Sequence, residues 1–185
     1  MFLETDRLSL RGLREEDLKE IEDWANDSNI TNLMVMGIRP DSGVIYCSWN
    51  TTEDEWNRYK ESKKDIIFVM TTKKDNKIIG IIGFYDINFM ERNAELRIVI
   101  GCRRYLSKGY GTESVNSLLD YGFNKLNFHK IHLGVNVENA GANKCYQKAG
   151  FKYEGTIRDF HFRNGRYYDS NIYSILENEY YEKKN

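Results

Sequence analysis

Hydrophobic and polar positions alternate with a two-residue period in several segments, which is the pattern of a half-buried strand. The first such segment is Arg7–Leu13, "RLSLRGL". Two segments joined by "KKDNK" predict a hairpin, and two near the C-terminus flank "FRNGR", whose Asn-Gly pair strongly favours a hairpin turn. We expect the remaining strands at 65–72, 77–87, 93–101, 130–137, 151–159 and 166–176.

Segments whose hydrophobic residues recur with a helical period lie between these strands. Leu18, Ile21 and Trp24 share one face of the first predicted helix, and a second helix begins at Thr51 with a capping threonine and early acids. Two more are expected at 111–127 and 140–150. The resulting order is β, α, α, β, β, β, α, β, α, β, β. Because βαβ occurs only near the end, we predict one domain, 1–185, with a mixed α/β (α+β) sheet.

Composition narrows the class of protein. The formal net charge of −1 gives the chain no general attraction to nucleic acid. The N-terminus does not resemble a signal peptide, and the longest apolar stretch, "IIGIIGFY" from Ile78, is too short to cross a membrane. Three dispersed cysteines form no CxxC pair. We therefore expect a cytoplasmic protein with no membrane or nucleic-acid partner and no metal.

The histidines and cysteines receive structural interpretations. His129, His132 and His161 lack the clustering of metal ligands, so we interpret them as structural or surface residues. Cys145 is interpreted as a small packed residue. A redox role for Cys102 or Cys145 stays open.

One loop carries a candidate chemical function. Gly109 and Gly111 stand between a predicted strand and a predicted helix, in "YLSKGYGTES". Unpaired amides at a helix N-terminus attract anions, and Arg103, Arg104 and Lys108 add positive charge. The segment matches neither GxGxxG nor a P-loop. Taken alone, it is either a phosphate-binding loop or a plain strand-to-helix turn.

A second segment, "NVENAGANKCYQKAGF" at Asn136–Phe151, resolves this choice. With both segments, the chain resembles the GNAT superfamily of acetyl-CoA-dependent N-acetyltransferases, most strongly over Ala94–Tyr173. The family's loop pattern is Gln/Arg-x-x-Gly-x-Gly/Ala. Both glycines match it, whereas Leu106 replaces the first residue. The terminal segments are typical of the ribosomal-protein and spermidine N-acetyltransferase branch.

The resemblance implies a fold and a set of roles. The fold is a mostly antiparallel central sheet flanked by helices, with a splayed parallel strand pair that holds CoA. Tyr146 matches the general acid that protonates the CoA thiolate, in a direct transfer without a covalent enzyme intermediate. Glu95 is the candidate base, and a water relay or a free amine are its alternatives. The expected acetyl-CoA contacts are Ile98, Val99, Ile100, Arg103, Arg104, Leu106, Ser107, Lys108, Gly109, Tyr110, Gly111, Thr112, Asn139, Asn143, Tyr146 and Lys148.

The acceptor is an amine whose identity stays open. The resemblance implies a wall that includes Trp24, Met34, Tyr85 and Phe160, with few acids. Because a polyamine site needs several carboxylates, this composition favours a protein N-terminus, a small amine or an amino sugar. The alternatives are a spermidine/polyamine N-acetyltransferase and a non-catalytic CoA-binding regulatory module. Relatives are often dimers, so a homodimer is compatible with the resemblance.

Overall fold

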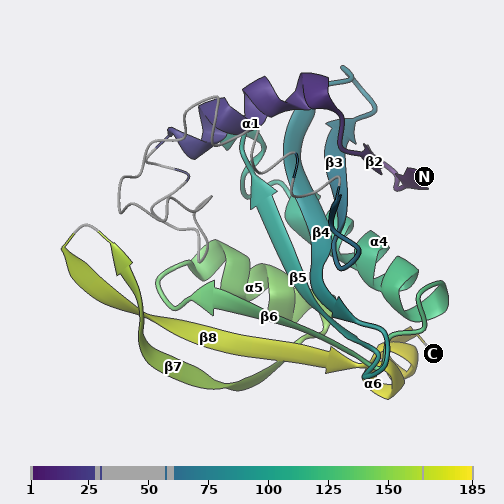
Figure 1. The fold of residues 1–185 in the computed structure, drawn as a ribbon, viewed down its shortest axis with the longest axis vertical. Coiled ribbons are helices and arrows are strands. Elements are labelled where there is room, and N and C mark those ends of the chain that lie inside the picture. Colours follow the sequence, from purple (N-terminus) through teal and green to yellow (C-terminus); the bar gives the residue numbers. More distant parts are fainter. Residues whose placement is uncertain (1, 28–29, 31–56, 58–60, 164, 185) are drawn as a thin grey trace.

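An eight-stranded sheet is the centre of the molecule (Figure 1). The computed structural model describes residues 2–27, 30, 57, 61–163 and 165–184. The strand order is β1-β2-β3-β4-β5-β6-β8-β7, and every neighbouring pair is antiparallel except β5 and β6. The predicted mixed, mostly antiparallel sheet is thus confirmed. The strands are β1 (Phe2–Glu4), β2 (Leu8–Gly12), β3 (Ile66–Thr72), β4 (Ile78–Asn88), β5 (Asn93–Ile100), β6 (Lys130–Asn136), β7 (Lys152–Arg163) and β8 (Arg166–Leu176).

Helices cover both faces of this sheet. The helical elements are η1 (Glu15–Asp17), α1 (Leu18–Ala25), η2 (Arg103–Tyr105), α4 (Tyr110–Asn124), α5 (Ala140–Ala149) and α6 (Glu177–Lys184). Helix α4 lies against one face, where a Cβ added to Gly122 would be 2.7 Å from the Phe84 ring. Helix α1 lies against the other face, where Val99 and Ile81 pack against the cluster that contains Ile21 and Trp24. Within the described residues, no helix combines the length and apolarity that a membrane crossing needs.

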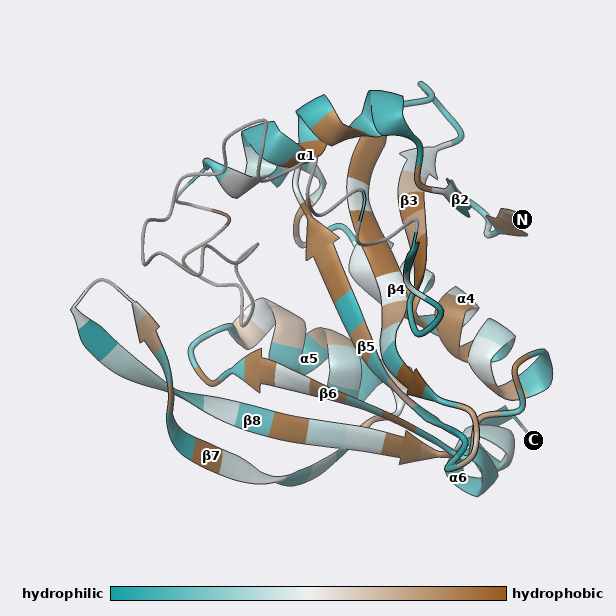
Figure 2. Ribbon diagram, viewed as in Figure 1, coloured by the Kyte–Doolittle hydropathy of each residue, from teal (hydrophilic) through white to brown (hydrophobic). Residues whose placement is uncertain are grey.

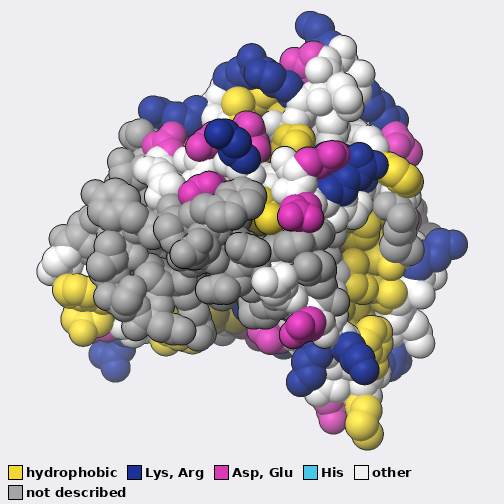
Figure 3. All heavy atoms as spheres, turned by 45° about the horizontal axis from the view of Figure 1, so that its top comes forward, with side chains coloured by type: hydrophobic (Ala, Val, Ile, Leu, Met, Phe, Trp, Pro, Cys, Tyr) yellow, Lys and Arg dark blue, Asp and Glu magenta, His cyan; other side chains and the backbone are white. Residues whose placement is uncertain are grey.

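The amphipathic pattern of the first helix is confirmed. Leu18, Ile21 and Trp24 are all buried. Figure 2 shows the apolar residues of β3, β4 and β5 that form the sheet's share of the core. On the outer surface, basic and acidic side chains are interspersed over the face shown in Figure 3. The helix therefore packs on one side, while its outward side carries one lysine and three acids, Lys19, Glu20, Glu22 and Asp23.

The parallel pair β5 and β6 separates after three residues. Asn93, Ala94 and Glu95 of β5 pair with the segment 130–132 of β6, and no pairing follows. Beyond this point β5 stays with β4 as far as Ile100, while β6 stays with β8. The two strands thus diverge as a V, visible in Figure 1. This confirms the splayed pair that the resemblance implied.

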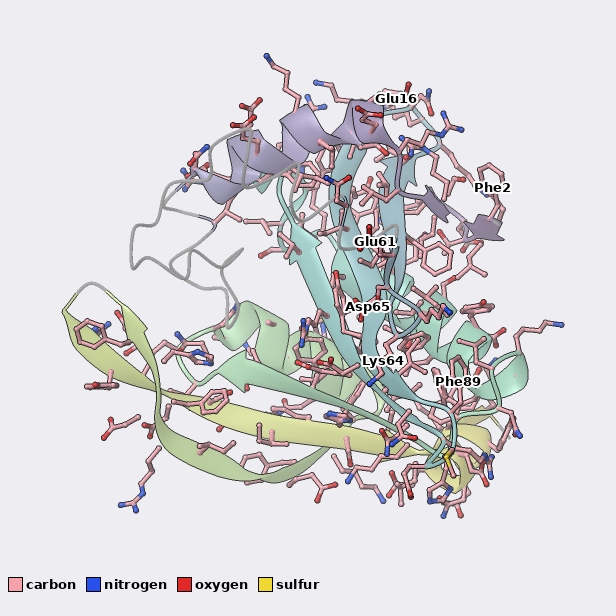
Figure 4. The ribbon with its side chains drawn as sticks, in the orientation of Figure 1. Phe2, Glu16, Glu61, Lys64, Asp65 and Phe89 are labelled. Carbon is pink, nitrogen blue, oxygen red and sulfur yellow. The ribbon has the colours of Figure 1, made fainter. Side chains whose placement is uncertain are left out.

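The two residues that precede β3 fix the end of β4. Asp65, labelled with Lys64 in Figure 4, accepts a hydrogen bond from the Asp86 amide at 3.1 Å. The Ile87 amide donates to the Lys64 carbonyl at 2.9 Å. Asp86 has a positive φ of 50°, and its carboxylate reaches Arg97 at 3.1 Å. These bonds hold a charged side chain beside the base of the V.

Three elements differ from the sequence-based expectation. Strand β1 and helix α6 were not predicted, because one is three residues long and the other, "ENEYYEKK", buries only Tyr180. Strand β7 continues to Arg163, beyond the predicted end at Asp159, because a register shift between Ile157 and His161 interrupts its alternation. Most of the helix predicted from Thr51 lies outside the described residues.

Candidate active site

The loop that joins β5 to α4 presents a row of unpaired amides. Gly109 is the N-cap of α4 with a φ of 84°, a conformation that suits glycine. In the part of the chain that the structure describes, the amides of residues 107–112 donate no hydrogen bond; the first α4 amide that does is that of Glu113. Amides of this kind at a helix N-terminus form an anion site. The predicted phosphate loop therefore has the required geometry.

Contacts with the turn between β1 and β2 hold this loop in place. Arg7 donates to the Lys108 carbonyl at 3.0 Å and its guanidinium lies 4.1 Å from the centre of the Tyr110 ring. Arg7 also pairs with Glu113 at 2.6 Å, and Thr5 donates to the same carboxylate. Burial opposes ionisation of Glu113, but these hydrogen bonds outweigh it and lower its pKa. The loop conformation is thus fixed before any ligand binds.

The predicted basic residues gather around the loop. Arg103, Arg104 and Lys108 are exposed there, as are Leu106 and Ser107. A cleft of about 290 Å³ adjoins it, lined by Thr72, Lys74, Asp75, Arg104, Tyr105, Lys108 and Tyr110. Asp75 lies 3.6 Å from Arg104 and offsets part of the positive charge. Lys148 is exposed on the last turn of α5.

The C-terminal half of β5 has a free backbone edge that faces the V. The Gly101 amide donates to Ile79 of β4 at 2.9 Å. Because backbone groups alternate between the two edges of a strand, the amide of Val99 also points to β4, whereas those of Ile98 and Ile100 point into the V. The geometry thus favours Ile98 and Ile100 over Val99 as donors to a ligand.

Two asparagines of the second motif have defined structural partners. Asn139 caps α5 by accepting from the Ala142 amide at 3.1 Å. Asn143 donates to the carbonyls of residues 136 and 139 and accepts from Asn171 and Tyr173. The Asn143 side chain therefore ties α5 to β6 and β8, and these bonds occupy its amide group.

Tyr146 lies in the main core, 6% exposed, with its ring edge-to-face against Phe151 at 5.9 Å. Burial raises its pKa far above the usual value, and the neighbouring Cys145 and Glu95 act in the same direction. The phenol thus remains protonated at neutral pH. Cys145 accepts a hydrogen bond from Thr112 at 3.4 Å, and burial raises its pKa, so it is a protonated, packed thiol.

A charged cluster lies where β5 and β6 separate. Glu95 pairs with Arg97 at 2.6 Å, and the guanidinium lies 4.5 Å from the centre of the Tyr85 ring. His132 is the register partner of Glu95 across the parallel pair. Burial lowers the pKa of His132, and the charge of Glu95 partly opposes this. Sequence reasoning interpreted His132 as a structural or surface residue, because its place opposite Glu95 depends on the pairing of β5 with β6.

The predicted acceptor residues have different surroundings. Trp24 is buried and packs over Gly101, so its indole belongs to the α1 core rather than to an open wall. Tyr85 is only 5% exposed and lies under Arg97. Phe160 is 51% exposed on β7. Met34 lies outside the described residues.

This site combines an anion loop, a strand edge with free amides, a protonated phenol, and a carboxylate and an imidazole in register on neighbouring strands. Residues 7–152 match the family described as acetyltransferase (GNAT) domain. A spermidine N(1)-acetyltransferase of Vibrio cholerae is 33% identical over 174 residues, covering 94% of this chain and 95% of that protein. A putative ribosomal N-acetyltransferase of Bacillus subtilis is 27% identical over 110 residues, 60% of each chain.

Solved structures of acetyltransferases also match this chain. The crystal structure of spermidine N-acetyltransferase from Vibrio cholerae in complex with CoA and spermine matches with a TM-score of 0.85 at 32% identity. The match covers 96% of this chain and 99% of that chain. The chain therefore belongs to the GNAT family and is an acetyl-CoA-dependent N-acetyltransferase.

Proposed function

We propose that the chain transfers the acetyl group of acetyl-CoA to the primary amine of an acceptor by direct attack in a ternary complex. The observation that carries this proposal is the V between β5 and β6, because it has an anion loop at its open end and a carboxylate at its base. The buried phenol of Tyr146 belongs to the helix that follows β6. These are the groups that binding a phosphorylated thioester and acylating an amine require.

Acetyl-CoA fits the groups present. The free amides of residues 107–112 would bind the pyrophosphate, with Arg103, Arg104 and Lys108 nearby for charge. The amides of Ile98 and Ile100 would pair with the pantetheine arm, as an added strand does. Both asparagines that the family motif offers as contacts also serve the protein, Asn139 as the cap of α5 and Asn143 as a tie to β6 and β8.

The chemistry requires a proton donor and an oxyanion partner. In the proposed reaction, the amine nitrogen attacks the thioester carbonyl, the N–C bond forms and the C–S bond breaks. Tyr146 donates its proton to the departing sulfur. A strand amide of β5 that points into the V stabilises the oxyanion. Glu95 lies at the base of the V, on the side from which the amine proton must leave.

The acceptor we favour is a monoamine, such as a protein N-terminus, a small amine or an amino sugar. The described cluster at the base of the V has two carboxylates, Glu95 and Asp86, which share the guanidinium of Arg97. This leaves little negative charge for a chain of cations. Spermidine is the second candidate, because the Vibrio cholerae relative carries that name and the two carboxylates could bind one ammonium group.

A thiol-release assay with acetyl-CoA tests the proposal. The panel contains spermidine, spermine, peptides with free N-termini, amino sugars and aminoglycosides. We expect at least one amine to release CoA, and we expect Tyr146→Phe to bind acetyl-CoA normally but to turn over at least about tenfold more slowly. Tyr121→Phe is the matched control, because Tyr121 is equally buried at 6% but lies in the last turn of α4, with its ring against Phe68.

Three outcomes would contradict parts of the proposal. Unchanged turnover in Tyr146→Phe would remove Tyr146 as the acid. Turnover with spermidine alone would reject the monoamine in favour of the second candidate. Stabilisation by acetyl-CoA without thiol release from any amine would indicate the non-catalytic CoA-binding module.

A further inference from the structure

His132 belongs to the last residue pair between the parallel strands β5 and β6. It is the register partner of Glu95, and no pairing between β5 and β6 follows this pair. Directly paired residues project on the same face of a sheet. Tyr85, which is opposite Glu95 on β4, belongs to this face as well. The imidazole, the carboxylate and the Tyr85 ring therefore belong to one face of the sheet, on three neighbouring strands at the base of the V.

Glu95 has only part of its carboxylate available. Its Oε2 atom is bound to Arg97 at 2.6 Å. Arg97 in turn binds Asp86 and stacks on Tyr85, so its position is fixed by three neighbours. This ion pair fixes the carboxylate in place and neutralises part of its charge. Glu95 is thus better suited to orient and stabilise a neighbouring cation than to act alone.

His132 is available in the form that accepts a proton. Its side chain is half-buried, and no hydrogen bond to either ring nitrogen occurs among the residues that the structure describes. Burial lowers its pKa, so the ring is mainly neutral at pH 7. A neutral imidazole with a free nitrogen is the usual general base of enzymes.

The charges that surround His132 come from three strands. Glu95 and Arg97 face it from β5, Asp86 from β4, and Lys130 from its own strand. Lys130 is engaged with Glu154 at 3.1 Å. On β8, the register partner of His132 is the uncharged Ser174. The two carboxylates favour a protonated imidazole, whereas Arg97 and Lys130 oppose it, and Glu95 is the stronger of the two favourable charges.

We propose that His132 accepts the proton of the attacking amine and that Glu95 positions and stabilises the resulting imidazolium. This inference rests on the proposed function and replaces Glu95 as the sole base. The amine nitrogen forms a bond to the carbonyl carbon and loses one proton to His132. The C–S bond breaks, and the sulfur takes one proton from Tyr146. Solvent then removes the proton from His132 and returns one to Tyr146, which completes the balance.

The test compares His132→Gln with wild type in the thiol-release assay, using the panel amine of highest turnover at saturation. We expect kcat to fall at least about tenfold, with unchanged acetyl-CoA affinity. The wild-type kcat should decline at acidic pH as His132 becomes protonated, and this acidic decline should be absent from the pH profile of His132→Gln. Added imidazole should restore part of the activity of His132→Ala. Glu95→Gln should move the acidic decline of kcat to lower pH, because a charge that favours the imidazolium is lost.

His129→Gln is the matched control. The His129 side chain is 51% exposed at the end of the α4–β6 connection, next to Glu177. We expect its kcat and pH profile to equal those of wild type. An active wild type together with a His132→Gln variant of full activity and unchanged pH profile would overturn the inference while leaving the proposed function intact. A wild type that releases no thiol with any amine would overturn both.

Discussion

At the scale of single residues, Asn143 illustrates how a motif residue can serve the fold. Its side chain makes four hydrogen bonds of 2.8–3.1 Å that join α5 to β6 and β8. We predict that Asn143→Ala lowers the free energy of unfolding by about 2–4 kcal/mol. Each hydrogen bond contributes about 0.5–1.5 kcal/mol, and the substitution removes all four at once. Urea unfolding followed by circular dichroism measures this.

Lys144→Ala is the control for this prediction. Lys144 is the next residue of α5 and is exposed, so its truncation should change stability by less than about 0.5 kcal/mol. If Asn143→Ala unfolded like wild type but bound acetyl-CoA much more weakly, Asn143 would be a ligand contact rather than a structural tie.

Residue roles were predictable where local sequence sets them. The positive φ of Gly109 and the capping role of Asn139 follow from their place between strand and helix. Tyr146 was identified by its motif, whereas its burial depends on the packing of α5. His132 could not be assigned, because its role depends on which strand pairs with β6 and in which register. Nothing local to "KIHLGV" contains that information.

At the scale of elements, the entry into the anion loop depends on close packing between α1 and β5. A Cβ added to Gly101 would overlap the Trp24 indole, whose ring is rigid and buried. We predict that Gly101→Ala lowers the free energy of unfolding by about 1–3 kcal/mol, because the overpacked ring or the strand end must shift. Thermal and urea unfolding report the loss.

Gly12→Ala is the matched control for this substitution. Gly12 also ends a strand, β2, but a Cβ there meets no atom within 4 Å. Its stability should therefore stay close to that of wild type. Equal stability of the two variants would show that α1 moves away from β5 without cost, and would contradict the packing account.

Elements were predictable where the pattern is long. The strands near 66–72, 78–88, 93–100 and 130–136 and the helix at 110–124 lie within a few residues of their predicted bounds. The continuation of β7 was missed because the shift between Ile157 and His161 breaks the alternation on which the prediction rested. The separation of β5 and β6 came from family resemblance alone, since each strand keeps a full hydrophobic pattern.

At the scale of the whole molecule, the splayed strands leave backbone groups that only a ligand can satisfy. The amides of residues 107–112 donate to nothing in the described structure, and those of Ile98 and Ile100 point into the V. We predict that acetyl-CoA slows hydrogen exchange at these amides. The Val99 amide points to β4, so its exchange should be slow with or without ligand, which provides an internal control.

The same binding should stabilise the fold. Acetyl-CoA at 100 times its Kd contributes about 2.7 kcal/mol, which corresponds to a rise in Tm of about 5–10 °C for a chain of this size. Pantetheine, which lacks the pyrophosphate, distinguishes the two sets of amides. It should slow hydrogen exchange at the amides of Ile98 and Ile100 but leave those of residues 107–112 in fast exchange. Protection of residues 107–112 by pantetheine, or their fast exchange with saturating acetyl-CoA, would contradict the assignment of this loop to the pyrophosphate. The comparison of the two ligands thus tests the two ends of the V separately. The amides of residues 107–112 are unpaired because they lie at the start of a helix, whereas those of Ile98 and Ile100 are unpaired because no strand pairs with this edge of β5.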